Sequence, residues 1–151
     1  ISVYRDTGGS DLRYYTDESG VWTNETVHTG SNYGKDSAIA LNSKDEVVIV
    51  YRKDDAADDI YMSVGNRGSW TSSLVASNRY ASYLAVAIDS NDDVHISSHN
   101  IRSHSGYCCN KDLEYFTNSS GSWVRTTLET GVGGIFGTMV IDNNDDIHIG
   151  S

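Results

Sequence analysis

Ala87-Ile88-Asp89-Ser90-Asn91-Asp92-Asp93-Val94-His95-Ile96 is the stretch that decides the fold, because it occurs three times in the chain. Its counterparts are residues 40–49 (ALNSKDEVVI) and 140–149 (VIDNNDDIHI), at spacings of 47 and 53 residues. A second phrase recurs at residues 11–22, 59–70 and 112–123, and each copy ends on one of the three tryptophans. The primary feature of the sequence is therefore an internal repeat of about 50 residues.

Each repeat predicts four short strands. An apolar run such as 84–88 leads into a turn of Asp, Asn and Ser, and residues 94–97 then alternate between apolar and polar. After a variable loop, residues 113–117 form a third predicted strand, and a glycine-containing turn leads to a fourth at 123–128. Val, Ile, Tyr, Thr and Ser dominate these segments, as is typical of strands. We therefore expect an all-β protein.

Four antiparallel strands per unit of 40–50 residues are typical of a β-propeller blade. A β-sandwich also has many short strands, but it gives no reason for this period. The prediction is a single unit over residues 1–151, with three four-stranded blades and half-blades at both termini. Each blade buries its apolar faces only against its neighbours, so one copy of the repeat is not expected to be stable alone.

The repeated phrases resemble a known class of repeats. Residues 87–97 and 112–123 are similar to tandem repeats of extracellular bacterial and archaeal β-propellers, and to the Asp-box repeat of the sialidase-like superfamily, Ser-x-Asp-x-Gly-x-Thr-Trp. One residue rather than two separates Gly121 from Trp123, and the acidic position is Asp17 or Glu18 in one copy but Ser or Asn in the others. The resemblance implies the propeller fold more strongly than any activity, because this fold hosts many functions.

Three blades are too few for a ring, since propellers have about four to eight. Residues 1–6 read as the end of a second strand, and the C-terminal segment, which ends at Gly150-Ser151, supplies a first strand and the start of a second. We therefore expect a homodimer that forms a six-bladed ring, with composite closing blades built from both chains. The alternative is a fragment of a longer propeller.

The charge balance narrows the partners. The chain has 11 Lys and Arg against 21 Asp and Glu, a net charge of −10. Nucleic acids and anionic membranes require a basic footprint, so neither is expected as a partner. The polar composition and the resemblance favour an extracellular or periplasmic location.

Basic and aromatic residues gather in the loops that a propeller places around the mouth of its central channel. Arginine and tyrosine suit a carboxylate-bearing or hydroxyl-rich ligand, through forked hydrogen bonds and ring stacking. The predicted ligand is a glycan or a small acidic molecule, and the alternative is ordinary solvation of these loops. The candidate ligand-binding residues are Tyr4, Arg5, Tyr33, Arg52, Arg79, Tyr80, His99, Arg102, His104 and Tyr107.

Metal and cofactor sites are not predicted. The long segment 99–111 contains the only two cysteines, Cys108 and Cys109, which are adjacent. Free thiols, a vicinal disulfide and a zinc site with His99 and His104 remain alternatives there. The acidic turns 89–93 and 142–146 offer oxygen ligands for calcium, but a repeated hairpin turn accounts for both. His95, His148 and the tryptophans are interpreted as packing residues.

Three functions remain open. A sialidase-like hydrolase would need an arginine cluster, a Tyr–Glu nucleophile pair and an acid/base Asp. Arg5, Arg52, Arg79 and Arg102 offer the arginines, but no Glu is predicted beside a Tyr on the loop face. We therefore expect a ligand-binding or interaction protein without catalysis, with the hydrolase and a structural interaction scaffold as alternatives.

Overall fold

The computed structural model describes residues 4–5, 11–30, 32–54, 58–66, 68–77, 80–102, 110–132 and 137–151. Over these ranges the secondary structure is entirely β, which confirms the predicted all-β class. The strands form four antiparallel sheets, and none of them closes on itself within the described residues. No helix in the described part of the chain has the length and apolar character needed to cross a membrane.

The four sheets follow one another in chain order, and we number them 1 to 4. Sheet 1 contains β1 (Tyr4–Arg5), β2 (Leu12–Thr16) and β3 (Thr23–His28). Sheet 2 contains β4 (Tyr33–Leu41), β5 (Val47–Lys53), β6 (Ile60–Asn66) and β7 (Ser69–Ala76). Sheet 3 contains β8 (Ala81–Ile88), β9 (Val94–Arg102), β10 (Asn110–Thr117) and β11 (Val124–Val132). Sheet 4 contains β12 (Thr138–Ile141) and β13 (Ile147–Gly150).

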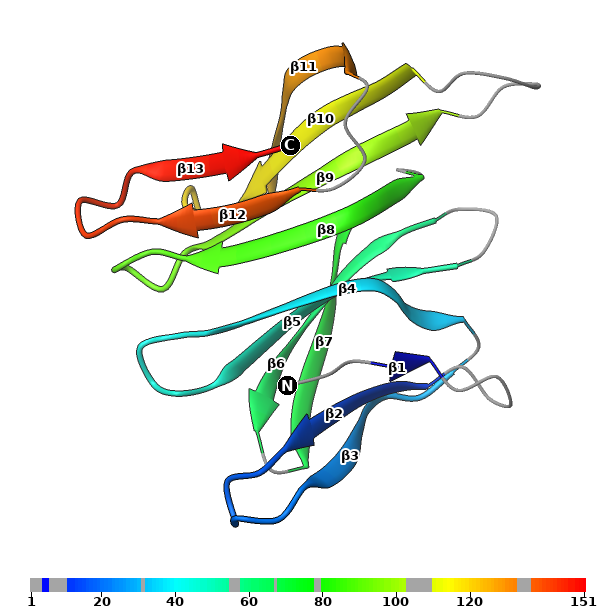
Figure 1. Cartoon of the computed structure of the whole chain (residues 1–151), viewed down its shortest axis with the longest axis vertical. Helices are drawn as coiled ribbons and strands as arrows, with labels where there is room; N and C mark the ends of the chain where they lie inside the picture. Colours follow the sequence, from blue (N-terminus) through cyan, green and yellow to red (C-terminus); the bar gives the residue numbers. More distant parts are fainter. Residues whose placement is uncertain are drawn as a thin grey trace.

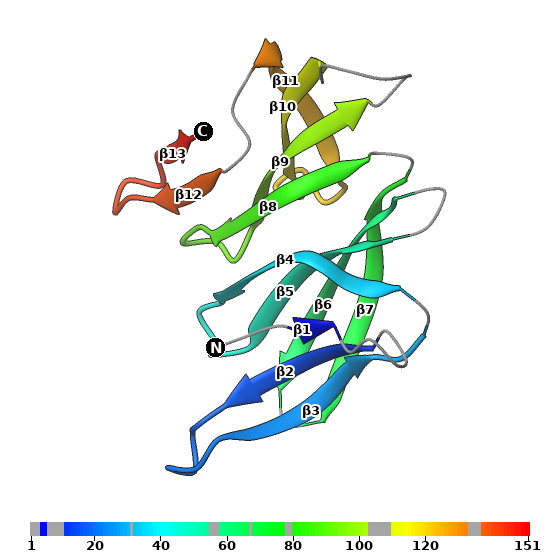
Figure 2. The ribbon, with the colours of Figure 1, turned by 45° about the vertical axis from the view of Figure 1, so that its right-hand side comes forward.

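The sheets are arranged along the long axis of the molecule, with sheet 1 at one end and sheets 3 and 4 at the other (Figure 1). The first strands of sheets 2, 3 and 4 lie side by side in both ribbon views (Figures 1 and 2). Contacts of β8 with β4 and with β12 agree with this arrangement. Neighbouring sheets therefore pack face to face, and the first strands of sheets 2, 3 and 4 are adjacent.

The strand registers confirm the sequence repeat. Ile39 pairs with Ile49, Val86 with Ile96, and Met139 with Ile149, at the same place in three hairpins. The later strands follow the same rule, since Leu12, Ile60 and Leu113 occupy equivalent positions opposite Arg5, Arg52 and His99. Equivalent residues of different sheets can therefore be compared directly.

Two apolar clusters hold the first three sheets together. β5 is buried on both faces, as expected for a central strand covered on each side. Its alternate residues Val47, Ile49 and Tyr51 face sheet 1, where Leu12, Tyr14 and Val27 complete one cluster. Val48 and Val50 face sheet 3 and pack in the second cluster, which includes Val94, Ile96 and Phe116. Because alternate residues of β5 face opposite sides, this one strand packs against both neighbouring sheets.

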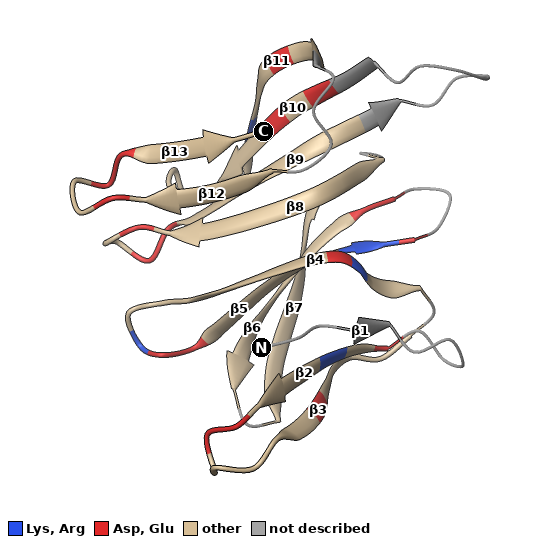
Figure 3. Ribbon diagram, viewed as in Figure 1, with Lys and Arg blue, Asp and Glu red and all other residues tan. Residues whose placement is uncertain are grey.

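The three acidic turns between first and second strands have one geometry. In each, the first side chain accepts hydrogen bonds from the backbone two and four residues ahead, as Asp89 does from Asn91 and Asp93 at 2.9 Å. The fourth residue of each turn has a positive φ, 58° at Asp45, 66° at Asp92 and 63° at Asp145. Asp and Asn tolerate this conformation better than other non-glycine residues. The acidic stretches are therefore hairpin turns, and they lie along one side of the molecule (Figure 3).

Candidate functional site

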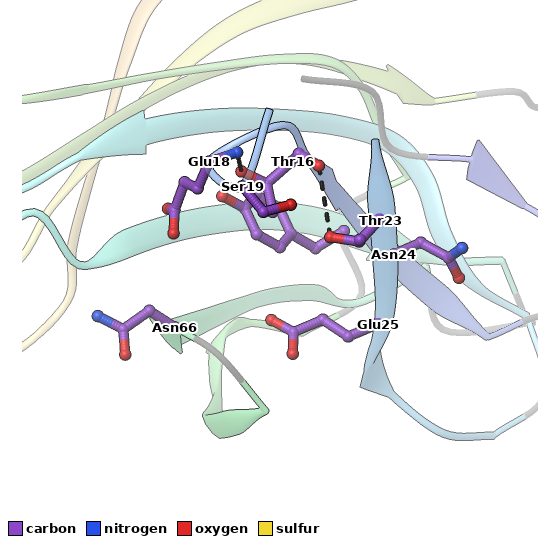
Figure 4. A pocket seen from close by; sticks show the side chains of 8 residues that line it. Thr16, Glu18, Ser19, Thr23, Asn24, Glu25 and Asn66 are labelled. Atoms are coloured by element: carbon purple, nitrogen blue, oxygen red, sulfur yellow. Dashed lines mark hydrogen bonds between the residues drawn. The ribbon is translucent and has the colours of Figure 1, made fainter. Parts of the chain in front are cut away.

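A polar pocket of about 420 Å³ lies between sheet 1 and the outer end of sheet 2. Most of its wall comes from β2, β3 and the turn that joins them, and Asn66 at the end of β6 closes the opposite side (Figure 4). Its lining residues are Tyr14, Thr16, Glu18, Ser19, Thr23, Asn24, Glu25 and Asn66. Such a concave site with several convergent polar groups is the usual setting for small-ligand binding.

The turn at the rim of the pocket is ordered by its own hydrogen bonds. The backbone N–H of Gly20 donates to the carbonyl of Asp17 at 2.7 Å, and Gly20 takes a φ of 78° that favours glycine. The Ser19 hydroxyl donates to the carbonyl of Val21 at 3.2 Å. The backbone N–H of Glu18 donates to the Thr16 hydroxyl at 3.3 Å (Figure 4). The rim residues are thus held in place by local chain geometry.

The Trp70 indole of sheet 2 contacts two of the lining residues, Glu25 and Tyr14. Its Nε1–H donates to Glu25 Oε1 at 3.1 Å, and its ring meets the Tyr14 ring edge-on at a centroid distance of 5.5 Å. Tyr14 itself is buried. The indole therefore fixes one carboxylate oxygen of Glu25, and Figure 4 shows the Glu25 side chain reaching toward Asn66.

The pocket offers the groups that recognise hydroxyl-rich ligands. Glu18 and Glu25 supply carboxylate acceptors, and the amides of Asn24 and Asn66 supply both donors and acceptors. Arg13 Nη1 donates to Asn24 Oδ1 at 3.1 Å and thereby orients that amide. The described lining contains two carboxylates and no Lys or Arg, which favours a neutral ligand over an acidic one.

Arg52, a predicted ligand-binding residue, is buried and surrounded by carboxylates. Its guanidinium contacts Asp58 at 2.7 Å and Asp36 at 3.1 Å, and Asp54 lies 3.8 Å away. Burial raises the pKa of Asp58, and the neighbouring Arg52 charge opposes that rise. The structure therefore shows Arg52 in an internal ion-pair network, where its charge is already balanced.

Tyr33, a second predicted residue, belongs to an aromatic cluster. Its ring stacks on His28 at a centroid distance of 3.9 Å and meets the rings of Tyr51 and Tyr61 edge-on. The ammonium group of Lys53 lies 5.5 Å from the Tyr33 ring centroid. Burial, and secondarily the Lys53 charge, lower the pKa of His28, and burial raises the pKa of Tyr51. The sequence predicts Tyr33 as a candidate ligand contact, and the structure shows the aromatic cluster in which it lies.

The other predicted residues are spread over the molecule. His99 is buried, with its ring edge-on to Tyr83 at 6.3 Å, and Tyr80 is exposed with a positive φ of 47°. Tyr4, Arg5 and Arg102 lie in β1 and β9, where the structure describes their backbone positions. The remaining three lie outside the described residues, as do the two cysteines: Arg79, His104, Tyr107, Cys108 and Cys109.

The histidines and tryptophans that the sequence predicts to pack differ in burial, according to whether a neighbouring sheet covers them. His95 is buried, with its Nδ1 2.6 Å from the Tyr115 hydroxyl, whereas the side chain of the equivalent His148 is 60% exposed. Trp70 and Trp123 pack against the two apolar clusters, but Trp22 is 60% exposed. The packing interpretation therefore holds for His95, Trp70 and Trp123. It does not hold for Trp22 or His148, since both are exposed and no other sheet in the described part of the chain covers them.

The described residues contain no group of three or more His, Cys, Asp or Glu side chains placed to hold a metal ion. A scan against protein-family models finds no match for this chain, and a search of the curated proteins finds no significant relative. The polar pocket is therefore characterised by its own geometry alone.

Proposed function

We propose that the protein is a glycan-binding module without catalysis, and that a neutral, hydroxyl-rich ligand occupies the pocket between β2, β3 and Asn66. The observation that carries the proposal is a fixed acceptor in the pocket: the Trp70 indole holds Glu25 at 3.1 Å, and Asn66 lies across the pocket from it. Tyr14 also lines the pocket, but its ring is buried against Trp70 and supports the wall. Sugar hydroxyls donate to carboxylates and exchange hydrogen bonds with amides, so these groups match a hydroxyl-rich ligand.

The same module fits the architecture of a β-propeller. In this proposal sheets 2 and 3 are complete blades whose innermost strands are β4 and β8, and sheets 1 and 4 are the two parts of a third. Two chains then complete a six-bladed ring as a homodimer. The repeated registers, and the packing of each sheet on the next, support this arrangement. An extracellular or periplasmic location, where proteins meet glycans, belongs to the same proposal.

The surroundings of Arg52 favour ligand binding over glycoside hydrolysis. A sialidase-like site would need an arginine cluster free to bind the carboxylate of its substrate. Arg52, the one candidate whose side chain the structure describes, is buried among Asp36, Asp54 and Asp58. The hydrolase alternative therefore lacks support at that position, while the described pocket lining offers amides, hydroxyls and carboxylates without Lys or Arg.

A glycan array followed by titration calorimetry tests the proposal. We expect binding to neutral glycans, and a loss of affinity of about tenfold or more in Glu25→Gln and Asn66→Ala, because each loses a polar contact to the ligand. Glu129→Gln is the matched control, since Glu129 is an exposed carboxylate on β11 outside the pocket. Absence of binding on the array would favour the scaffold alternative, and turnover of a fluorogenic sialoside would favour the hydrolase.

A further inference from the structure

Each tryptophan occupies the same place in its sheet, but only two of the three pack against another sheet within the described residues. Trp70 of sheet 2 packs on Tyr14 of sheet 1, and Trp123 of sheet 3 packs against the cluster between sheets 2 and 3. Trp22 of sheet 1 is 60% exposed. By the repeat, its partner should be the outer hairpin of a preceding sheet.

The surface that matches Trp22 is uncovered at the other end of the molecule. Leu128 lies in the bulge of β11, at the position that Val27 and Val75 occupy in β3 and β7. Val27 and Val75 are each 7% exposed, because sheets 2 and 3 cover them, whereas Leu128 is 49% exposed. Sheet 3 therefore presents an apolar face where a following outer hairpin would pack.

Hydrogen bonds join each acidic turn to the next, and the first and last turns each keep one half of this contact unused within the described residues. The carboxylate of Asp92 accepts hydrogen bonds from the backbone N–H and hydroxyl of Ser43, both at 2.7 Å. Asp145 makes the same two contacts with Ser90, at 2.9 and 2.6 Å. Asp45, the equivalent acceptor in the first turn, and Asn143, the equivalent donor in the last, make no such contact among the described residues.

The apolar residues beside these two turns repeat the pattern. Leu41 is equivalent to Ile88, which packs in the cluster between sheets 2 and 3. Leu41 is 52% exposed, on the face of sheet 2 that points toward sheet 1. Val140 is 59% exposed, on the face of sheet 4 that points away from the buried Met139. The uncovered surfaces at the two ends of the molecule are therefore complementary. Both present apolar side chains, and one offers a hydrogen-bond acceptor where the other offers a donor.

The repeated geometry points to a second copy of this chain as the partner that covers these surfaces. In this arrangement Trp22 of one copy packs on Leu128 of the other. Asp45 of the first accepts hydrogen bonds from Asn143 of the second, and Leu41 covers Val140. Sheet 1 and sheets 3 and 4 lie at opposite ends of one molecule (Figure 1), so a single chain cannot make these contacts with itself.

Both surfaces are present on every copy, so a two-fold axis forms two identical junctions and leaves neither surface open. At each junction, β12 and β13 of one copy lie beside sheet 1 of the other and form one composite layer. The inference rests on the proposed propeller assembly and adds the residues that join the chains.

Mixing two variants tests the apolar part of the junction. Light scattering of the wild type should give about 33 kDa, twice the 16.5 kDa of the chain. Trp22→Ser and Leu128→Asp should each shift the mass toward the monomer, because every junction in either homodimer is half damaged. An equimolar mixture should recover dimer, since the mixed pair has one junction with both wild-type residues. A wild-type monomer at about 100 µM, or no recovery on mixing, would overturn the inference.

A charge reversal tests the polar part. Asn143→Asp places a carboxylate against Asp45 and should weaken dimerisation about tenfold or more, and Asp45→Lys combined with Asn143→Asp should restore it. Asn144→Asp is the matched control, because it adds the same charge in the same turn at a position outside the Asp–Ser ladder. Equal weakening by the control would contradict the assignment.

The proposed dimer and the proposed glycan site can be tested independently. The pocket lies within one chain, between sheets 1 and 2. The Leu128→Asp monomer should therefore bind glycan if the proposed function holds, whether or not the wild type is a dimer. Dimerisation without glycan binding would refute the proposed function and leave the junction intact.

Discussion

The carboxylate of Asp92 accepts two hydrogen bonds from Ser43, across the gap between sheets 2 and 3, although 49 residues separate them in the chain. The same relationship joins Asp145 to Ser90. Side-chain contacts between turns therefore supplement the apolar clusters in fixing the spacing of the sheets.

Replacing Asp92 with asparagine should lower the melting temperature. Asparagine tolerates the positive φ of 66° at this position, so backbone strain does not contribute. Its amide retains one acceptor oxygen but turns an NH2 group toward a donor of Ser43, and both charge-assisted bonds weaken. Differential scanning calorimetry measures the effect, and Asp93→Asn in the same turn is the control. Equal shifts in both variants would show that the Ser43 contact contributes nothing.

The Asp92 contact should also make stability depend on pH. Hydrogen bonds from the Ser43 backbone and hydroxyl lower the pKa of Asp92 below its ordinary value of 3.8. The unfolded state therefore binds the proton more readily, so this contribution is present above pH 3.8 and is lost as the pH falls further. Urea unfolding at several pH values should show the difference between the wild type and Asp92→Asn shrinking below pH 3.8. A constant difference would contradict the pKa assignment.

His28 should give a second pH effect in a higher window. Burial, followed by the Lys53 charge, lowers its pKa below 6.5, so the folded state disfavours the protonated ring. Its contribution opposes folding increasingly as the pH falls below 6.5, and is absent well above it. His28→Gln should reduce the slope of stability between about pH 5 and 7, as followed by urea unfolding. An unchanged slope would place the titrating group elsewhere.

Gly65 should tolerate no side chain. Its φ is 156°, and a Cβ would lie 1.9 Å from the carbonyl oxygen of Ser69. Gly65→Ala should destabilise the protein by about 2–5 kcal/mol, since it combines a steric clash with an unfavourable backbone conformation. Gly150→Ala is the control, because the nearest atom to its Cβ would be 3.5 Å away. Chemical denaturation of both variants measures the contrast, and equal stabilities would contradict it.

Trp70→Phe should weaken the pocket more than the fold. Phenylalanine keeps an aromatic ring beside Tyr14 but removes the Nε1–H that donates to Glu25. We expect a loss of about 1–2 kcal/mol in unfolding free energy, because the carboxylate is partly solvated. Glycan affinity should fall further, since Glu25 is no longer fixed in place. Trp123→Phe in the equivalent position of sheet 3 is the control for the ring change.

The repeat predicted the sheets well, because period and strand patterning are local properties of the sequence. The hairpins at residues 40–49, 87–96 and 140–149 have identical register, and β5 and β9 begin where the pattern places them. The packing role of Trp22 was predicted wrongly for the isolated chain, since it depends on a neighbour that the chain does not supply.

The site was harder to predict, because it depends on which residues of different sheets meet. Arg52 is the type of residue that binds acidic ligands, but three carboxylates surround it, one from β4 and two from the connection between β5 and β6. Glu25 is not among the residues predicted for the site, and only the position of Trp70 shows that its carboxylate is held in a pocket. Ser73 and Thr126 occupy the equivalent positions, so the carboxylate at Glu25 is a departure from the repeat that could have identified it.

The turn contacts also separate two ends of the molecule in how freely they can change. Ser43 fixes sheet 2 against sheet 3, and Ser90 fixes sheet 3 against sheet 4, at the end where first and second strands meet. The connections at the opposite ends of the second strands, residues 54–59 and 103–109, differ in both length and sequence. Because spacing is set at the turn end, an insertion in these connections need not move the neighbouring sheet. The sequence of the acidic turns is thus constrained by the spacing of the sheets, whereas the connections at the opposite rim are free to vary in length and sequence.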